Sequence, residues 1–206
     1  MSDFTRPRER GPYRPGIRRR EQLIAAATDA FGEHGYAGAS IRTIAERAGV
    51  SHASLIQHFG SKEGLLVAVL EEWDRRTVED GLADVSGLAY FRRLPEVMAA
   101  HRENRGLLEL FTTIAGEASS PSHPAHGFIA ERYAKNLATL AGHLREAIEA
   151  GDIAPMPADG IDVEVRLMTA VLDGIGLQWL VDPSTDAVAG VAAYVERAIR
   201  SWRGRE

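Results

Sequence analysis

The chain has 206 residues, of which 45% are hydrophobic and 26% charged, a balance typical of one or two folded domains. It has no cysteine, which excludes disulfides, thiolate metal sites and a cysteine nucleophile. The net charge is −5, but residues 1–62 carry ten Lys and Arg against six Asp and Glu, whereas residues 63–206 carry 14 against 23. A basic head on an acidic body indicates that only the head meets a polyanion.

The N-terminal segment lacks the apolar region of a secretory signal, and no stretch approaches the roughly 20 apolar residues of a membrane span. We therefore expect a cytoplasmic protein without a membrane partner. Residues 1–16 contain three Pro, two Gly and four Arg and offer little to pack, which predicts a disordered arm.

From Ile17 onward the pattern is helical. Apolar residues recur on one face from Leu23 to Phe31, and this helix is expected to end near Gly35. Two short helices follow at 40–48 and 51–59, separated by Gly49, and a long one begins at Ser61. Further helices are expected at about 88–103, 105–118, 125–150, 159–181 and 185–203, with prolines between them. No segment alternates as a strand does, so the fold class is all-α with about nine helices.

The segment SIRTIAERAGVSHASLIQHFGSK has the spacing of a helix-turn-helix. Ala45 is a small residue that lets the second helix approach, and Gly49 suits a turn with positive φ. Ile44, Val50 and Leu55 supply the apolar contact between the helices. This arrangement leaves the second helix exposed for the major groove of DNA. An ordinary helical hairpin is the alternative, but the three helices, the glycine turn and the basic bias together favour the DNA-binding interpretation.

With these motifs in view, the run from Leu23 to Leu70 resembles the DNA-binding region of TetR-type regulators. The resemblance lies in LIAAATDAFGEHGY, SIRTIAERAGVS, HASLIQHF and GSKEGLL. It implies an N-terminal three-helix bundle at 17–62 and a larger ligand-binding and dimerisation domain at 63–206. One position departs from the family, which usually has an aromatic residue, most often Tyr, where this chain has Ile56. A tyrosine hydroxyl contact to phosphate is therefore not expected.

DNA contacts are assigned by residue type and expected exposure. Gln57 can pair with adenine, and His52 or Ser54 can donate to purine acceptors. Lys62 and His58 are expected to hold phosphates, helped by the N-terminus of the helix that starts there. The full expected set is Arg18, Arg19, Arg42, Thr43, Ser51, His52, Ser54, Gln57, His58 and Lys62.

The arginine-rich arm has two interpretations, a solvated tail or a segment that reaches phosphates or the minor groove. We favour the contact, chiefly for Arg18 to Arg20, which adjoin the first helix. The arginines in question are Arg6, Arg8, Arg10, Arg14, Arg18, Arg19 and Arg20.

The last two helices carry apolar stripes, and the family resemblance favours a homodimer formed by a four-helix bundle. The alternative is that the stripes face the chain's own core. The stripe residues are Leu167, Val171, Gly174 and Gln178 in the helix at 159–181, and Val188, Val191, Val195, Ile199 and Trp202 in the helix at 185–203. A two-fold dimer predicts a palindromic operator.

The resemblance also implies a small-molecule pocket among the helices at 88–150. Candidates mix apolar and polar side chains, as ligand pockets do, although each alone is more simply a core residue. They are His101, Leu108, Phe111, Thr112, Tyr133, Met168, Leu172 and Asp173. Asp173 is the most suggestive, because a carboxylate in an apolar stretch needs an arginine, a hydroxyl or a ligand cation.

No metal site or cofactor is expected, since His123 and His126 have no evident third ligand and lie in a loop rich in Pro and Ser. No phosphate loop, nucleophile elbow or metalloprotease motif indicates an enzyme. The leading hypothesis is a repressor that a small-molecule effector releases from a double-stranded DNA operator. An activator or ligand-independent regulator of the same fold, and a small-molecule-binding protein or enzyme without DNA function, remain alternatives.

Overall fold

The computed structural model describes residues 14–82 and 84–204, and within them the chain forms nine α-helices and no strand. This confirms the all-α expectation. The helices are α1 (Arg14–Gly38), α2 (Ile41–Arg47), α3 (His52–Phe59), α4 (Lys62–Gly81), α5 (Gly87–Glu103), α6 (Arg105–Glu117), α7 (His126–Glu149), α8 (Ala158–Val181) and α9 (Ala187–Trp202).

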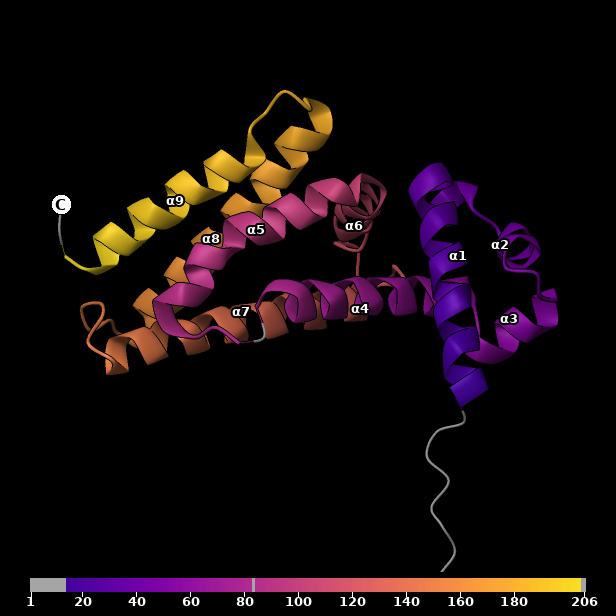
Figure 1. Ribbon diagram of the computed structural model, residues 1–206, viewed down its shortest axis with the longest axis horizontal. Coiled ribbons are helices and arrows are strands. Elements are labelled where there is room, and N and C mark those ends of the chain that lie inside the picture. The colour runs from indigo at the N-terminus through magenta and orange to yellow at the C-terminus, as the bar shows by residue number, and fades with distance from the viewer. Residues whose placement is uncertain (1–13, 83, 205–206) are drawn as a thin grey trace, which may run out of the picture.

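Helices α1 to α3 form a head at one end of the molecule, and α4 leads from the head into the body (Figure 1). α1 begins at Arg14 rather than at Ile17, and the remaining arm residues 1–13, with Arg6, Arg8 and Arg10, lie outside the described residues. The helix is interrupted at Gly35, whose φ of 68° and ψ of 172° are not helical. Glycine reaches this φ without a Cβ clash, which explains the break expected there.

The head and the body touch where α1 crosses α6. The two backbones meet at Gly32 and Gly106, where a Cβ on Gly32 would lie 3.5 Å from the Gly106 Cα. A Cβ on Gly106 would lie only 2.8 Å from the Gly32 Cα, so the crossing requires glycine at 106. The head is therefore joined to the body by this crossing as well as by α4.

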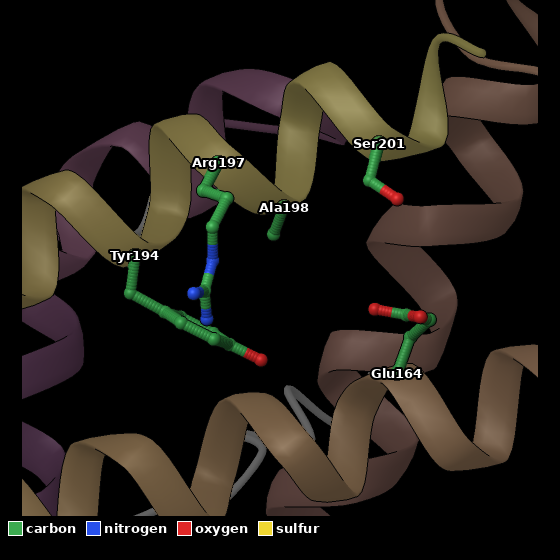
Figure 2. Close-up of a pocket in the computed structure, with 5 residues that line it drawn as sticks. All are labelled: Glu164, Tyr194, Arg197, Ala198 and Ser201. Carbon is green, nitrogen blue, oxygen red and sulfur yellow. The ribbon is translucent and has the colours of Figure 1, made fainter. Parts of the chain in front are cut away.

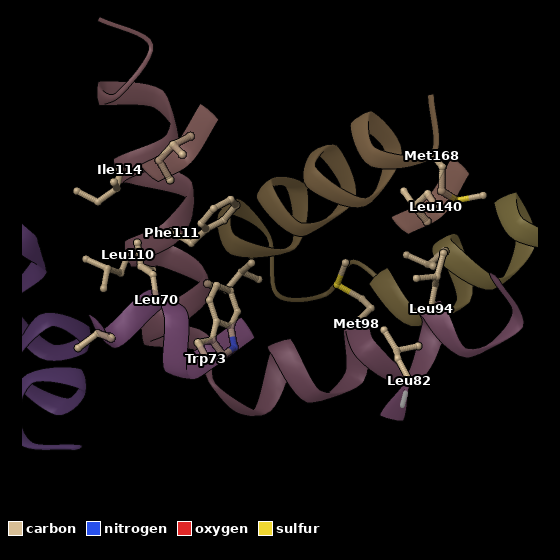
Figure 3. Close-up of a cluster of buried hydrophobic side chains, with 14 of the residues drawn as sticks. Leu70, Trp73, Leu82, Leu94, Met98, Leu110, Phe111, Ile114, Leu140 and Met168 are labelled. Atoms are coloured by element: carbon tan, nitrogen blue, oxygen red, sulfur yellow. The ribbon is translucent and has the colours of Figure 1, made fainter. Parts of the chain in front are cut away.

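The body has a continuous apolar core that extends towards the head (Figure 3). Trp73 of α4 and Phe111 of α6 lie together near the head, with ring centroids 5.9 Å apart. Met168 of α8 lies beside Leu140 in the view and away from Phe111, and it is only 1% exposed. The core thus contains side chains from each of the helices α4, α5, α6, α7 and α8.

The apolar stripe of α9 points into the chain's own core. Val191, Val195 and Ile199 are each 1% exposed and Trp202 is 4% exposed, and the Trp202 ring meets Phe91 of α5 at 5.0 Å. These four side chains are buried within one chain and are not available to a second copy. This corrects the expectation that they form a dimer interface, whereas Val188 is only half-buried.

Candidate DNA-binding site

The turn of the helix-turn-helix is built by caps and one glycine. Ser40 caps α2 reciprocally with Thr43: the Thr43 N–H donates to the Ser40 Oγ at 3.1 Å, and the Ser40 N–H donates to the Thr43 Oγ1 at 3.2 Å. Gly49 has a φ of 64°, and the Val50 N–H then donates to the Ala45 carbonyl at 2.9 Å. Buried Ala45 and Leu55 close the contact between α2 and α3, as the spacing predicted.

The outward face of α3 is small and polar. His52, Ala53 and Gln57 are exposed, Ile56 is half-buried, and Leu55 points into the head core. Because Ala53 and Gln57 are one turn apart, they occupy the same face. Sequence reasoning missed Ala53, whose signal is its place four residues before Gln57. A methyl group at this position can contact the methyl group of thymine.

Three expected contact residues already serve the local fold. The Ser51 Oγ accepts from the Ser54 N–H at 3.1 Å and caps α3. The Thr43 hydroxyl donates to the Ser40 carbonyl at 2.8 Å. Ser54 is half-buried, while Ser51 and Thr43 remain exposed. These hydrogen bonds therefore cap the N-termini of α2 and α3 and fix the residues at which the two helices begin.

The corner between α3 and α4 depends on a close backbone approach that sequence reasoning also missed. Ser61 caps α4 by accepting from the Gly64 N–H at 3.1 Å. A Cβ on Gly64 would lie 2.1 Å from the Phe59 carbonyl oxygen, so no side chain fits there. Gly64 therefore brings the N-terminus of α4 against the end of the recognition helix, and this places Lys62.

Lys62 is held over an aromatic ring. Its Nζ lies 4.4 Å from the centroid of Tyr36, and the Tyr36 hydroxyl donates to the Glu63 Oε1 at 2.9 Å. Burial raises the pKa of the Tyr36 phenol, and the Glu63 carboxylate adds to the rise. The hydrogen bond from Ser61 is the main cause that lowers the pKa of Glu63, so Glu63 is ionised at neutral pH.

The basic residues around the head have different partners. Arg18 is exposed, whereas the Arg19 Nη2 donates to the Gly49 carbonyl at 3.3 Å and so supports the turn. Arg42 is exposed and pairs with Glu46, one turn along α2, at 3.0 Å. His58 is exposed at the end of α3. The expected phosphate contacts therefore lie around the recognition helix, although Arg19 also has an internal role.

In the body, several predicted pocket residues come together around Arg132 of α7. Its guanidinium makes two hydrogen bonds of 2.8 Å to the two carboxylate oxygens of Asp74 in α4 and lies 4.1 Å from the Phe111 centroid. The neighbouring Tyr133 donates to the Asp173 Oδ2 at 2.7 Å. Burial raises the pKa of Asp173, although the Tyr133 hydrogen bond opposes it. The cluster therefore links α7 to α4 and α8 through polar side chains, and to α6 through the Phe111 ring.

His101 adjoins this cluster, with its ring 4.7 Å from Trp73. Burial, helped by the positive charge of Arg132, lowers the pKa of His101 to about 4, so the imidazole is neutral at pH 7. The Thr112 hydroxyl donates to the Leu108 carbonyl within α6, and Leu108 is buried near Gly176 of α8. Leu172 is half-buried against the core, and Met168 lies away from Phe111.

The exposed apolar surface is concentrated on one face of α8. Among the described residues, the large hydrophobic side chains that remain exposed are Val163, Leu167, Leu177 and Val181. With Ala170 and Gly174 they form one stripe along the helix. The predicted residues Leu167 and Gly174 belong to it, Gln178 is exposed at its edge, and half-buried Val171 turns further towards the core.

A cleft of about 300 Å³ runs between α8 and α9 next to the α8 stripe (Figure 2). Its walls are Glu164 from α8 and Tyr194, Arg197, Ala198 and Ser201 from α9. The Trp202 Nε1 donates to the Glu164 Oε2 at 2.8 Å, which ties the two helices together. The cleft is therefore part of the outward α8–α9 face.

Comparison with known proteins agrees with this architecture. The family model described as "Bacterial regulatory proteins, tetR family" matches residues 23–69. The HTH-type transcriptional repressor AcnR of Corynebacterium diphtheriae is 27% identical over 189 residues, which cover 89% of this chain and 92% of AcnR. The HTH-type transcriptional activator FasR of Mycolicibacterium smegmatis is 48% identical over 62 residues, or 30% of this chain and 28% of FasR.

Among solved structures, the transcriptional regulator FadR of Bacillus subtilis, in complex with stearoyl-CoA, superposes with a TM-score of 0.73 at 21% identity. The match covers 87% of this chain and 97% of FadR, and it shows the shared fold. Fold and helix-turn-helix thus define a DNA-binding transcriptional regulator. The match at residues 23–69 shows that the DNA-binding region of this chain is similar to that of TetR-family regulators.

None of the helices in the described part of the chain has the length and hydropathy of a membrane span. No group of three or more His, Asp or Glu within 14–82 and 84–204 is arranged to hold a metal ion. His126 instead bonds through Nδ1 to the Ala118 carbonyl at 2.7 Å, so it fixes the loop before α7.

Proposed function

We propose that two copies of this chain bind a palindromic operator in the cytoplasm, repress transcription from it, and leave it when a small molecule binds the body. The observation that carries the DNA part is the exposed face of α3 with Ala53 and Gln57, which is followed by Lys62 at the start of α4. The Gln57 amide can donate one hydrogen bond to adenine and accept another from it. Lys62 and His58 can bind phosphates.

The second copy belongs on the α8–α9 face. The exposed stripe of Val163, Leu167, Leu177 and Val181 is too large and continuous for an isolated water-exposed helix face. A two-fold axis through it would pair each stripe with itself and close the adjoining cleft. Such a dimer would set the two α3 helices about 34–36 Å apart, one turn of DNA.

The ligand part is supported by the cluster around Arg132. Asp74, Phe111 and Asp173 come from three different helices, and Asp74 is on α4, the helix that leads into the head. A ligand that rearranges this cluster would therefore bias the position of α4. By thermodynamic linkage, operator DNA would then weaken ligand binding by the same factor.

An activator is the second candidate, because 62 residues of this chain are 48% identical to FasR, whose name describes an activator. DNA-binding geometry alone does not set the sign of regulation. The relatives named above are transcriptional regulators, and our proposal includes no catalytic step.

A gel-shift titration against the DNA upstream of the chain's own gene tests the proposal. We expect specific binding that survives competition by scrambled DNA, with an affinity that falls as salt rises. Equal affinity for the scrambled duplex would contradict the proposal that the chain binds a specific operator. A transcription assay from the same DNA then separates a repressor from an activator.

A further inference from the structure

The joint between α5, α6 and the C-terminal end of α8 contains a buried donor without a partner. Trp179 of α8 is 6% exposed, and its indole Nε1 is the one buried side-chain nitrogen or oxygen among the described residues that lacks a hydrogen bond. Buried polar groups are nearly always paired, so such an orphan requires an explanation. Because an indole N–H can only donate, it requires an acceptor.

Two guanidinium groups cover the same indole. The Arg102 Cζ lies 5.6 Å and the Arg105 Cζ 5.1 Å from the Trp179 ring centroid. No ion pair joins either arginine to a carboxylate in the part of the chain that the structure describes. The Asp182 Oδ1 accepts from the Ser184 N–H and hydroxyl, at 3.0 and 2.7 Å, and not from either arginine. Neither guanidinium at this joint is therefore ion-paired with a carboxylate among the described residues.

The same joint contains the N-terminus of α6, a helix of 13 residues. Its N-cap residue, Asn104, makes no side-chain cap bond, and its Nδ2 donates to the Ala100 carbonyl at 3.1 Å. The Asn104 side chain therefore does not cap the positive end of the helix dipole, which lies next to Arg105. The Arg105 Nη2 donates to the Leu180 carbonyl at 2.8 Å.

We propose that this joint binds an anionic group, a carboxylate or a phosphate, that accepts hydrogen bonds from the Trp179 Nε1 and the guanidinium groups of Arg102 and Arg105. The Trp179 Nε1 and the two guanidinium groups can only donate, and hydrogen bonds from charged donors to an anion are stronger than those to water. Arg102 is exposed at the surface and can swing aside to admit the anion.

The position of the site connects it to the head. Arg105 directly precedes Gly106, whose backbone meets Gly32 of α1. An anion that draws Arg105 away from the Leu180 carbonyl would shift the first turn of α6 against α1. This regulatory consequence rests on the proposed function of ligand-controlled DNA binding, whereas the anion site itself does not.

Nuclear magnetic resonance of the full chain tests the site directly, because the protein has only three tryptophans and so three indole N–H signals. Benzoate, neutral benzamide and cationic benzamidine have nearly the same shape, and inorganic phosphate serves as the second anion. We expect benzoate or phosphate to move the Trp179 signal, assigned with W179F, to lower field. A comparison of the titrations with benzoate and with phosphate shows which anion the site prefers.

Arg102→Gln is the decisive variant, because its exposed side chain can be changed without disturbing the core, and Arg145→Gln on the exposed face of α7 is the matched control. We expect R102Q to weaken anion binding at least tenfold and R145Q to leave it unchanged. The proposal would be overturned if neither anion changed the chemical shift of the Trp179 indole. It would also be overturned if benzamide and benzamidine changed that shift as much as the anions do. Equal losses in R102Q and R145Q would do the same.

Operator binding, followed by fluorescence anisotropy with and without the anion, separates this inference from the proposed function. If the anion binds at Trp179 but leaves DNA affinity unchanged, the site stands and its regulatory consequence fails. If the chain binds no operator at all, the proposed function fails while the indole signal still decides the site.

Discussion

At the scale of single residues, the head separates side chains that form the motif from those free to read DNA. Ser40, Ser51 and Thr43 cap the two short helices, whereas Gln57 and Ala53 face outward on α3. Ile56, where the family usually has an aromatic residue, is half-buried. We therefore propose that phosphate binding depends on Lys62, His58 and the arginines around α1 and α2 rather than on a hydroxyl at position 56.

We predict that Gln57→Ala and Lys62→Gln weaken operator binding in different ways. Gln57→Ala should cost about 1–3 kcal/mol and relax the preference at one base pair. Lys62→Gln should weaken binding to all sequences and reduce the slope of log K against log salt by about 1. Anisotropy titrations over a salt series measure both, and an unaltered salt slope in Lys62→Gln would argue against the phosphate contact.

The neutral imidazole of His101 gives a pH prediction. Burial holds its pKa at about 4, below the value of about 6.5 in the unfolded chain. The unfolded state therefore binds more protons between these values, so His101 lowers stability as the pH falls from about 6.5 to 4.

His101→Gln should make thermal stability less dependent on pH over that range, and His34→Gln on the surface of the head is the control. Melting temperatures measured from pH 7 to pH 4 test this. If His101→Gln and the unmodified chain lose stability in parallel, the buried imidazole is not the cause.

At the scale of helices, most of the architecture could be predicted because each helix carries its own signals. Gly35, Gly49 and Gly60 have positive φ, and each lies where the helical pattern of the sequence is interrupted. Packing partners are a different matter, since an amphipathic stripe shows that a helix is covered but not by what. The α9 stripe from Val191 to Trp202 is covered by the chain itself, so the exposed apolar surface lies on α8 instead.

Long-range pairings were the part that sequence could not supply. The sequence indicates that Asp173 needs a partner, because its carboxylate lies in an apolar stretch of helix. The structure shows that this partner is the hydroxyl of Tyr133. The contacts of Arg132 with Asp74 and Phe111, and of Arg102 with Trp179, join residues far apart in the chain. No local pattern reports such contacts, because they depend on how complete helices cross.

The crossing of α1 and α6 predicts an asymmetry between its two glycines. Gly106→Ala would place a Cβ 2.8 Å from the Gly32 Cα and should cost about 1–3 kcal/mol, with a displaced head. Gly32→Ala makes only an ordinary contact of 3.5 Å and should be tolerated. Denaturant unfolding measures the free energies.

Gly116→Ala is the matched control within α6, because its Cβ would meet nothing within 4 Å. It should be neutral or stabilise by up to about 1 kcal/mol, since alanine is the better helix former. Equal losses from Gly32→Ala and Gly106→Ala would contradict the close crossing.

At the scale of the whole molecule, we propose that two copies of the chain join through α8. Leu167→Glu and Leu177→Glu place a charge in the proposed interface and should give a monomer that still folds, because both residues are about half exposed in the single chain. Ala138→Glu on the exposed face of α7 is the control. Analytical ultracentrifugation with circular dichroism measures mass and folding together, and a dimer that survives both substitutions would place the interface elsewhere.

The central claim is that a two-fold dimer reads DNA with α3, and hydroxyl-radical footprinting on the upstream DNA tests it most directly. We predict two symmetric protected half-sites whose centres lie about 34–36 Å apart along the duplex, with protection weakened in Gln57→Ala and Leu167→Glu at the same protein concentration. A single half-site protected by the unmodified chain, or protection that is undiminished in both variants, would contradict it.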